Sequence, residues 1–408
     1  MLDGSVPDRA VSESPAIRPP RVAIVASHVI QYQAPFFRLL AREIDADFTV
    51  LYCSRHGAEA YHDVDMGTTL RWDVDLLSGY RYRFLRNLGV GRGYTRLVNP
   101  GIVSALRGGR YDVVILFLGW GTVTSLMAIA TCDGSAVPFL LYGDSSFLPP
   151  EDTPSRRLRA RALKEMFRRA RGFLVSGHLN AEYYKHYGAD EARFSFVPWA
   201  IDNDRFSAAS AFASGEREAM RARFGIRPDQ MAIVFSGKLI RRKGPMTLLR
   251  AVEGDLRGRV TVMFLGQGEL RKPLEAFAKT QGIQVHFPGF VNQTELPKHY
   301  AMADVFVLPS FDDPRATVIN EAMACGLPVV VSNRCGPIGD IAKDGDNALV
   351  FRAGDEATLA AHLRHLAEQP ALRQRMGRRS REIIAGWNYQ RGVEGVRDAL
   401  GKCLHLTD

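Results

Sequence analysis

The chain has 408 residues, of which 46% are hydrophobic and 24% charged, as is typical of a soluble globular protein. This length exceeds what one ordinary core accommodates, so two domains are expected. The formal net charge of +9 favours an anionic partner, and the five scattered cysteines lack the spacing of a disulfide framework or a zinc site. Reduced thiols in the cytoplasm are therefore expected.

Residues 1–20 mix both charge signs and lack the apolar core of a signal peptide, which predicts a disordered tail. Short apolar runs bounded by turn-prone residues then begin at Arg21, and helical patterns lie between several of them. The runs are RVAIVAS, FTVLYC, DVVILFL, VPFLLYGD and GFLVSG. This alternation predicts a parallel sheet covered by helices on both faces, over residues 21–200.

Val113 to Cys132 contains no charged residue over 20 positions, about the length of a membrane span. Glycine, threonine and serine interrupt the stretch in GWGTVTS. A buried strand, a loop and a helix therefore explain it better than a span.

The segment 156–171 is strongly basic, and Leu163, Met166, Phe167 and Ala170 form an apolar stripe along it at helical spacing. One face of this helix is therefore expected to pack on the sheet. Two interpretations of its cationic face remain open: a solvated surface, or peripheral contact with an anionic membrane at the inner face of the cell membrane.

After Pro198, a run of small and polar residues from Ser207 to Gly215 predicts a linker over 201–218. A second series of apolar runs follows within 219–385. The runs are MAIVFSGKL, VTVMFLGQG, IQVHFPGF, DVFVLPS, LPVVVSN and ALVFRAGD. Ligands of doubly wound sheets lie beyond the carboxyl ends of the strands, so the loops after these runs are the candidate sites.

The loop SGKLIRRKGP carries Gly237, which allows a close turn, and Lys238 and Lys243, which could hold a diphosphate. A solvated basic turn is the alternative. FLGQGEL, with Gly266, and FPGFVN end two further strands and could approach a ligand by their backbone, although simple turns explain them equally well.

The stretch SFDDPRATVINEAMACGLP places Asp313 in a loop and Glu321 on a helix that begins near Thr317. Carboxylates accept hydrogen bonds from hydroxyl groups, which sugars offer in number. A capped helix with a solvated acidic loop is the alternative.

In this order, SGKLIRRKG, FLGQGEL, FPGFVN, FVLPSFDDPRATVINEAMACGLPVVVS and IGDIAKDGDNALVF resemble the carboxy-terminal half of glycosyltransferase family 4. The resemblance covers most of residues 230–352 and is weaker in the first half, where VPWAIDNDRF is similar to bacterial members. It implies a retaining enzyme of the α/β GT-B fold, with two Rossmann-like doubly wound domains facing across a cleft. Residues 21–200 would bind the acceptor and 219–385 the nucleotide sugar, while a helix in 386–408 would cross back to the first domain.

The resemblance also implies roles for single residues. Lys238 and Lys243 would hold the donor diphosphate, Glu321 the ribose hydroxyls, and Asp313 the donor sugar near its reacting carbon. Asp313, Lys238 and Lys243 are the expected catalytic residues, and the FPGFVN loop would receive the nucleobase. The expected donor site comprises Gly237, Lys238, Lys243, Gly266, Phe290, Val291, Asp313, Ala316, Thr317 and Glu321.

Several positions depart from the family pattern. Asp313 replaces a glutamate, and Arg315 and Ala316 stand where an aromatic residue and a glycine are usual. Arg315 could face an anionic group of a substrate, or be solvated or paired with Asp312. The loop around Trp120 lacks the histidine that many members carry there.

Residues after strands of the first domain are the candidates for the acceptor side: His28, Gln31, Tyr32 and Asp144. Trp72 and Asp73 could shape the same region, with a core tryptophan as the alternative. No DxD motif of the metal-binding kind ends a strand, because DVD occurs only at 63–65 and 73–75, where acceptor contacts are expected. No metal and no cofactor beyond the nucleotide-sugar co-substrate is expected.

The sequence thus predicts a cytoplasmic, retaining glycosyltransferase that moves a sugar from a UDP- or GDP-linked donor to a glycan, lipid-linked or small-molecule acceptor. The departures at Asp313, Arg315 and Ala316 leave a catalytically silent sugar-nucleotide-binding subunit as the alternative. A nucleic-acid partner is not expected, because the positive charge is not interleaved with aromatic residues in a binding motif.

Overall fold

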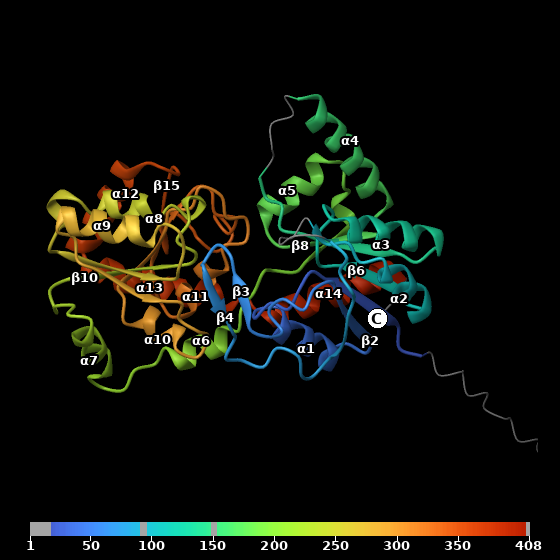
Figure 1. The fold of residues 1–408 in the computed structure, drawn as a ribbon, viewed down its shortest axis with the longest axis horizontal. Coiled ribbons are helices and arrows are strands. Elements are labelled where there is room, and N and C mark those ends of the chain that lie inside the picture. Colours follow the sequence, from blue (N-terminus) through green and yellow to red (C-terminus); the bar gives the residue numbers. More distant parts are fainter. Residues whose placement is uncertain (1–17, 90–95, 148–152, 405–408) are drawn as a thin grey trace, which may run out of the picture.

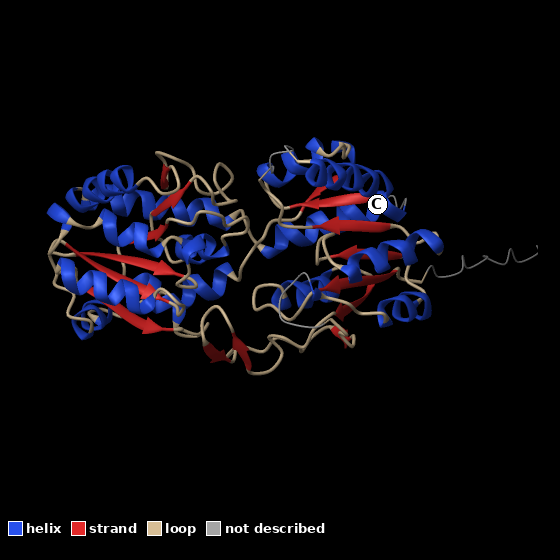
Figure 2. Cartoon of the chain, turned by 45° about the horizontal axis from the view of Figure 1, so that its top comes forward, coloured by secondary structure: helices blue, strands red, loops and turns tan. Residues whose placement is uncertain are grey.

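The computed structural model describes residues 18–89, 96–147 and 153–404. They form two α/β domains that lie side by side (Figure 1). Helices cover both faces of the main sheet in each domain (Figure 2). The predicted doubly wound architecture is therefore confirmed.

The N-terminal domain contains a parallel sheet of seven strands in the order β5-β2-β1-β6-β7-β8-β9. Its central strands are buried on both faces, which explains their continuous apolar runs. The strands are β1 (Arg21–Ala26), β2 (Asp47–Tyr52), β5 (Arg81–Phe84), β6 (Val113–Leu116), β7 (Phe139–Tyr142), β8 (Gly172–Val175) and β9 (Phe194–Phe196). The helices are α1 (Ala34–Glu43), α2 (Gly101–Gly109), α3 (Val123–Gly134), α4 (Pro154–Arg169) and α5 (His178–His186).

The uncharged stretch from Val113 to Cys132 forms β6, a loop and most of α3, as predicted. Within the described ranges, no helix combines the length and the apolar character that crossing a membrane requires.

The C-terminal domain contains a parallel sheet of six strands in the order β12-β11-β10-β13-β14-β15. The strands are β10 (Met231–Ser236), β11 (Val260–Leu265), β12 (Val285–Gly289), β13 (Val305–Leu308), β14 (Val329–Ser332) and β15 (Ala348–Phe351). The helices are α6 (Asn203–Ala209), α7 (Glu216–Arg223), α8 (Pro245–Ala251), α9 (Arg271–Gln281), α10 (Leu296–Ala301), α11 (Thr317–Ala324), α12 (Glu356–Glu368) and α13 (Pro370–Ala385).

The chain crosses between the domains near Trp199, which is buried in the N-terminal core, and Ile201, which is buried in the C-terminal core. Residues 201–218 therefore do not form the predicted linker. They contain α6, whose Phe206 is buried in the C-terminal core, and the first residues of α7.

After α13 the chain returns to the N-terminal domain as α14 (Tyr389–Leu404), which packs against α1 and β9. The two crossings are joined by hydrogen bonds: the Trp387 indole donates to the Trp199 carbonyl (3.1 Å), and the Asn203 amide donates to the Ile384 carbonyl (2.8 Å).

The first residues of the described chain are attached to the N-terminal domain. Arg18 forms an ion pair with Asp112 at 2.8 Å, and the Pro20 carbonyl accepts a hydrogen bond from the backbone of Asp47. Of the predicted tail, residues 1–17 lie outside the described residues.

A short antiparallel hairpin of β3 (Tyr61–Asp63) and β4 (Thr68–Leu70) extends from the N-terminal domain toward the C-terminal one (Figure 1). This hairpin, and the edge strands β5 and β9, were not among the predicted strands. These short strands contain polar or charged residues, so no apolar run marks them.

Candidate functional site

The candidate site lies where the connections of each sheet reverse direction. β10 and β13 are neighbours at the reversal in the C-terminal sheet, and β1 and β6 in the N-terminal one. Ligands of doubly wound sheets bind at such points, beyond the carboxyl ends of the strands. The predicted lysines follow β10, the predicted acids follow β13, and His28, Gln31 and Tyr32 follow β1.

The turns after β10 and β11 come into close contact through two glycines. Gly266 has φ of +155°, and a Cβ atom there would lie 1.9 Å from the carbonyl oxygen of Gly237. No larger residue fits without moving backbone. The two turns that follow the paired strands β10 and β11 therefore stay close together next to Lys238.

Lys243 and Asp313 form an ion pair between the loops after β10 and β13. Gly244 makes this possible, because its left-handed φ of +66° and missing side chain let the turn approach the Pro309 carbonyl. Both charged side chains are mostly buried. The structure thus brings together two of the three predicted catalytic residues.

Ala316 caps the start of α11 in a conformation usual for glycine, with φ of +39° and ψ of +42°. Its backbone amide donates a hydrogen bond to the Asp313 carboxylate at 3.3 Å. The helix begins at Thr317, as predicted. Glycine adopts this left-handed conformation readily, whereas an L-residue such as Ala316 is strained by about 1–2 kcal/mol.

We expect Ala316→Val to lower the free energy of unfolding by about 2 kcal/mol, because a β-branched side chain tolerates the left-handed region poorly and the site is buried. Ala316→Gly is the control, with a change below about 1 kcal/mol, since relief of strain and a more flexible unfolded chain offset each other. Urea denaturation of the C-terminal domain measures both. Equal losses for the two variants would contradict the assigned backbone conformation.

Glu321 is buried on α11, and the hydroxyl of the buried Tyr300 donates a hydrogen bond to its carboxylate at 2.8 Å. Burial raises the pKa of Glu321 to about 7, although the Tyr300 hydrogen bond and the charge of Arg205 both lower it. Hydroxyl groups of a ligand that donate hydrogen bonds to this carboxylate would stabilise its charged form and so offset the cost of burial.

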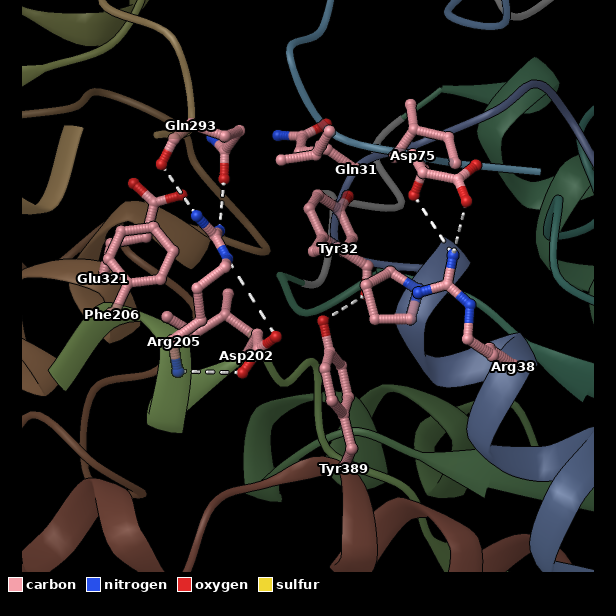
Figure 3. A pocket seen from close by; sticks show the side chains of 14 residues that line it. Gln31, Tyr32, Arg38, Asp75, Asp202, Arg205, Phe206, Gln293, Glu321 and Tyr389 are labelled. Carbon is pink, nitrogen blue, oxygen red and sulfur yellow. Dashed lines mark hydrogen bonds and ion pairs between the residues drawn. The ribbon is translucent and has the colours of Figure 1, made fainter. Parts of the chain in front are cut away.

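A cavity of about 170 Å³ lies between the domains beside Glu321 (Figure 3). The C-terminal side contributes Arg205, whose guanidinium donates two hydrogen bonds of 2.7 Å to Gln293. Gln31 and Tyr32 line the opposite side, so the cavity joins a predicted donor residue to two predicted acceptor-side residues.

Lys238 lies at the end of β10 but contacts the N-terminal domain. Its ammonium is 3.0 Å from Asp63 and 2.8 Å from Asp65, both in the β3–β4 hairpin. The DVD segment at 63–65 therefore contacts Lys238, which was predicted to bind the donor diphosphate, whereas acceptor contacts were expected for this segment.

The loop expected to receive a nucleobase also meets the N-terminal domain. Phe290 packs edge-to-face against Trp72, with ring centroids 5.6 Å apart, and Val291 packs against the C-terminal core. Asp73 accepts hydrogen bonds from the backbone amides of Gln293 and Thr294 at 3.1 Å. Trp72 is half-buried: it packs against the N-terminal core on one side and against Phe290 of the C-terminal domain on the other.

Arg315 reaches across the cleft, so the expectation that it is solvated or paired with Asp312 was wrong. Its guanidinium forms an ion pair with Asp144 and donates a hydrogen bond to the Tyr32 hydroxyl, both at 2.8 Å. It also lies over the indole ring of Trp199, 5.3 Å from the centroid. Arg315, two positions after Asp313, thus connects the donor side to the predicted acceptor-side residues Asp144 and Tyr32.

His28 is the remaining acceptor-side candidate. Its Nδ1 atom is 2.9 Å from the Ser27 hydroxyl, and its ring meets that of His56 edge-on at 5.2 Å. Burial, reinforced by His56, lowers the pKa of His28 to about 3, so the imidazole is neutral at physiological pH. A further contact between the domains joins His178, at the start of α5, to Asp340: the Nδ1 atom lies 3.1 Å from the carboxylate, which also accepts hydrogen bonds from the His178 backbone amide.

The basic segment forms α4, whose buried residues Ala160, Leu163 and Phe167 face the domain core. Its basic side chains are exposed, and Leu158 among them is 67% exposed. The predicted division into a packed stripe and a cationic face is therefore confirmed.

Two residues beside Glu321 were not singled out from the sequence: Tyr300 and Arg205. Tyr300 lies on a helix without a motif. Arg205 belongs to VPWAIDNDRF, the segment noted for its similarity to bacterial members, which was the available signal. Within the described ranges, no three histidine, cysteine or acidic side chains are grouped as a metal ion would require.

Residues 216–383 match the family model described as glycosyl transferases group 1. Two relatives named D-inositol 3-phosphate glycosyltransferase are each 31% identical. The protein of Geodermatophilus obscurus matches over 224 residues, 52% of this chain and 48% of its own. The protein of Streptomyces scabiei matches over 272 residues, which are 63% of this chain and 60% of its own. The chain spans about half the length of the curated relatives it matches.

Solved structures are similar over almost the whole chain. Anabaena Alr3699/HepE in complex with UDP and glucose has a TM-score of 0.70 at 15% identity, covering 94% of this chain and 99% of that one. WaaG, a glycosyltransferase involved in lipopolysaccharide biosynthesis, has a TM-score of 0.65 at 19% identity, covering 92% and 98%. The expected GT-B fold, two Rossmann-like domains facing across a cleft, is therefore confirmed.

Proposed function

We propose that this chain, whose residues 216–383 match the model of the group 1 glycosyl transferases, transfers a sugar from a nucleoside diphosphate donor to an acceptor at the wall of the N-terminal domain. One observation supports this most: Lys243, Asp313 and Glu321 gather at the point of the C-terminal sheet where ligands of such sheets bind. They offer a cation for phosphate and carboxylates for hydroxyl groups.

In the proposed reaction, the bond between the sugar carbon and the diphosphate oxygen breaks while an acceptor hydroxyl attacks the same face. Attack on the face that the diphosphate leaves gives retention of configuration, and the leaving diphosphate takes the acceptor's proton. Lys243 and Lys238 stabilise the charge that develops on the leaving group, as preorganised cations do in other transfer reactions. Glu321 holds the ribose hydroxyls, and Asp313 orients the donor sugar. This scheme invokes no metal ion and no cofactor.

A UDP- or GDP-linked sugar is the proposed donor, because the solved neighbours include complexes with UDP and UDP-glucose. A polar acceptor, either a glycan, a lipid-linked sugar or a small polyol, fits the wall formed by Gln31, Tyr32 and Asp144. The relatives' name, D-inositol 3-phosphate glycosyltransferase, makes a phosphorylated polyol a natural first acceptor to screen.

Calorimetric titration with UDP, GDP and ADP, followed by a screen of their sugars for diphosphate release with acceptors, tests the function. We expect one nucleoside diphosphate to bind and its sugar to be consumed. Binding without release under any acceptor would favour the catalytically silent subunit instead. Absence of binding by all three nucleotides would contradict both.

We also propose that α4 attaches the N-terminal domain to the cytoplasmic face of an anionic membrane, since exposed Leu158 lies among its basic residues. Each basic side chain near such a surface contributes about 1 kcal/mol. We therefore expect Arg161→Gln with Lys164→Gln to weaken the affinity for phosphatidylserine vesicles, measured by sedimentation, about thirtyfold. Arg375→Gln with Arg378→Gln, two exposed arginines of α13, is the matched control. Equal effects of both pairs would contradict α4 as the contact.

A further inference from the structure

The N-terminal domain covers the donor side of the cleft with one continuous segment. We call residues 61–75 the acidic strap; it comprises the β3–β4 hairpin and the residues that follow it. The strap lies against the C-terminal domain at the end of β10 and at the loop after β12, the two places where a diphosphate and a nucleobase are proposed to bind.

At the first place, two carboxylates of the strap hold the ammonium of Lys238. Asp63, which is mostly buried, also accepts a hydrogen bond from the backbone of Met66 at 3.0 Å, so the hairpin turn fixes its position. Asp65 is exposed. One ammonium between two carboxylates has no excess positive charge to offer a diphosphate, and the carboxylates repel any anion that approaches it.

At the second place, an aromatic side chain of the strap occupies the position beside the nucleobase loop. Trp72 packs against Phe290, the Arg71 carbonyl accepts a hydrogen bond from Asn292 at 2.6 Å, and Asp73 holds the backbone of Thr294. The strap therefore places negative charge at the phosphate end and an aromatic ring at the base end, in the order in which a nucleotide carries them.

We infer that the acidic strap occupies the donor site of the free protein as an internal substitute for the nucleotide, and that a nucleoside diphosphate must displace it. This inference rests on the proposed function. Asp63 and Asp65 thereby set the affinity for the donor, because their release from Lys238 is part of every binding event. A ligand with one phosphate is attracted less strongly to the Lys238 ammonium than a diphosphate, so it displaces the strap less well.

Asp65→Asn is the first test, since Asp65 is exposed and an amide keeps its shape. We expect UDP, or GDP or ADP if one of these is the nucleotide that binds, to bind about tenfold more tightly in calorimetry, and Asp63→Asn to act in the same direction. Glu59→Gln is the matched control, because Glu59 is an exposed acid close in sequence that pairs with Arg55 instead. It should leave the affinity unchanged.

A double-mutant cycle shows whether the gain passes through Lys238. In a Lys238→Met background, Asp65→Asn should no longer tighten binding. Hydrogen exchange gives an independent readout: amides of residues 61–70 should exchange faster when the nucleotide is bound.

The outcomes separate the strap from the proposed function. Nucleotide binding that is unchanged or weaker in Asp65→Asn, or slower exchange of the strap in the complex, would overturn the strap as a competitor while the glycosyltransferase proposal stands. Binding that appears only in the variants would support both proposals. If neither the natural protein nor any variant binds UDP, GDP or ADP, both fall.

Discussion

Replacing Lys243 with alanine is expected to lower sugar transfer about 100- to 1,000-fold, because the leaving diphosphate loses a cation at the moment its charge develops. Lys243 is mostly buried and fixed by Asp313, so the cation is positioned before the donor arrives. Charge that is already in place stabilises a transition state without further reorganisation. Release of nucleoside diphosphate at saturating donor sugar measures the effect.

A loss of stability must be separated from this loss of activity. Lys243→Ala leaves the carboxylate of Asp313 buried without its partner, which costs about 3 kcal/mol. Lys243→Met combined with Asp313→Asn should recover stability but not transfer. Arg241→Ala, an exposed cation in the same basic turn, should stay within about twofold of the natural protein. Undiminished turnover in Lys243→Ala would remove the lysine from the mechanism.

Glu321→Gln is expected to make the stability of the free protein less dependent on pH. Burial raises the pKa of Glu321 to about 7, from an ordinary value of 4.5. The folded protein therefore binds more protons than the unfolded chain between about pH 4.5 and 7. Stability falls as pH rises through this window, by about 3 kcal/mol in total, and the cost is complete above pH 7.

The measurement is the difference in free energy of unfolding between the natural protein and Glu321→Gln at several pH values. The variant should gain up to about 3 kcal/mol at pH 8 and show little difference near pH 4.5. His28 acts in the opposite direction, because its lowered pKa of about 3 makes stability rise with pH up to about 6.5; this contribution cancels in the difference. A difference that is constant with pH would contradict the buried, protonated Glu321.

The same variant should weaken nucleotide binding about tenfold, because an amide replaces the carboxylate that is proposed to accept two hydrogen bonds from the ribose hydroxyls. Greater stability together with weaker binding is a combination that a general packing defect does not produce.

The sequence predicts those parts of the site that lie within one strand–loop–helix unit. The start of α11 at Thr317, and the neighbouring placement of Asp313 and Glu321, follow from local order along the chain. Their physical signals are a buried strand, a turn and a helix that ends at a glycine, all within about 20 residues.

What could not be predicted depends on contacts between distant segments. Arg315 is 171 positions from its partner Asp144, and Lys238 is 173 from Asp65. No periodicity encodes such pairs. The sequence places both charge signs in the loops after the strands, but only the arrangement of the domains determines which carboxylate meets which cation.

Two hydrogen bonds join the two chain crossings into one connection between the domains: Trp387 bonds to Trp199, and Asn203 bonds to Ile384. Opening of the cleft about this connection would break the ion pairs of Lys238 and Arg315 and separate His178 from Asp340. Partly exposed ion pairs contribute about 1 kcal/mol or less each. The ion pairs across the cleft therefore contribute only a few kcal/mol to its closure, an amount that the binding of one substrate can offset.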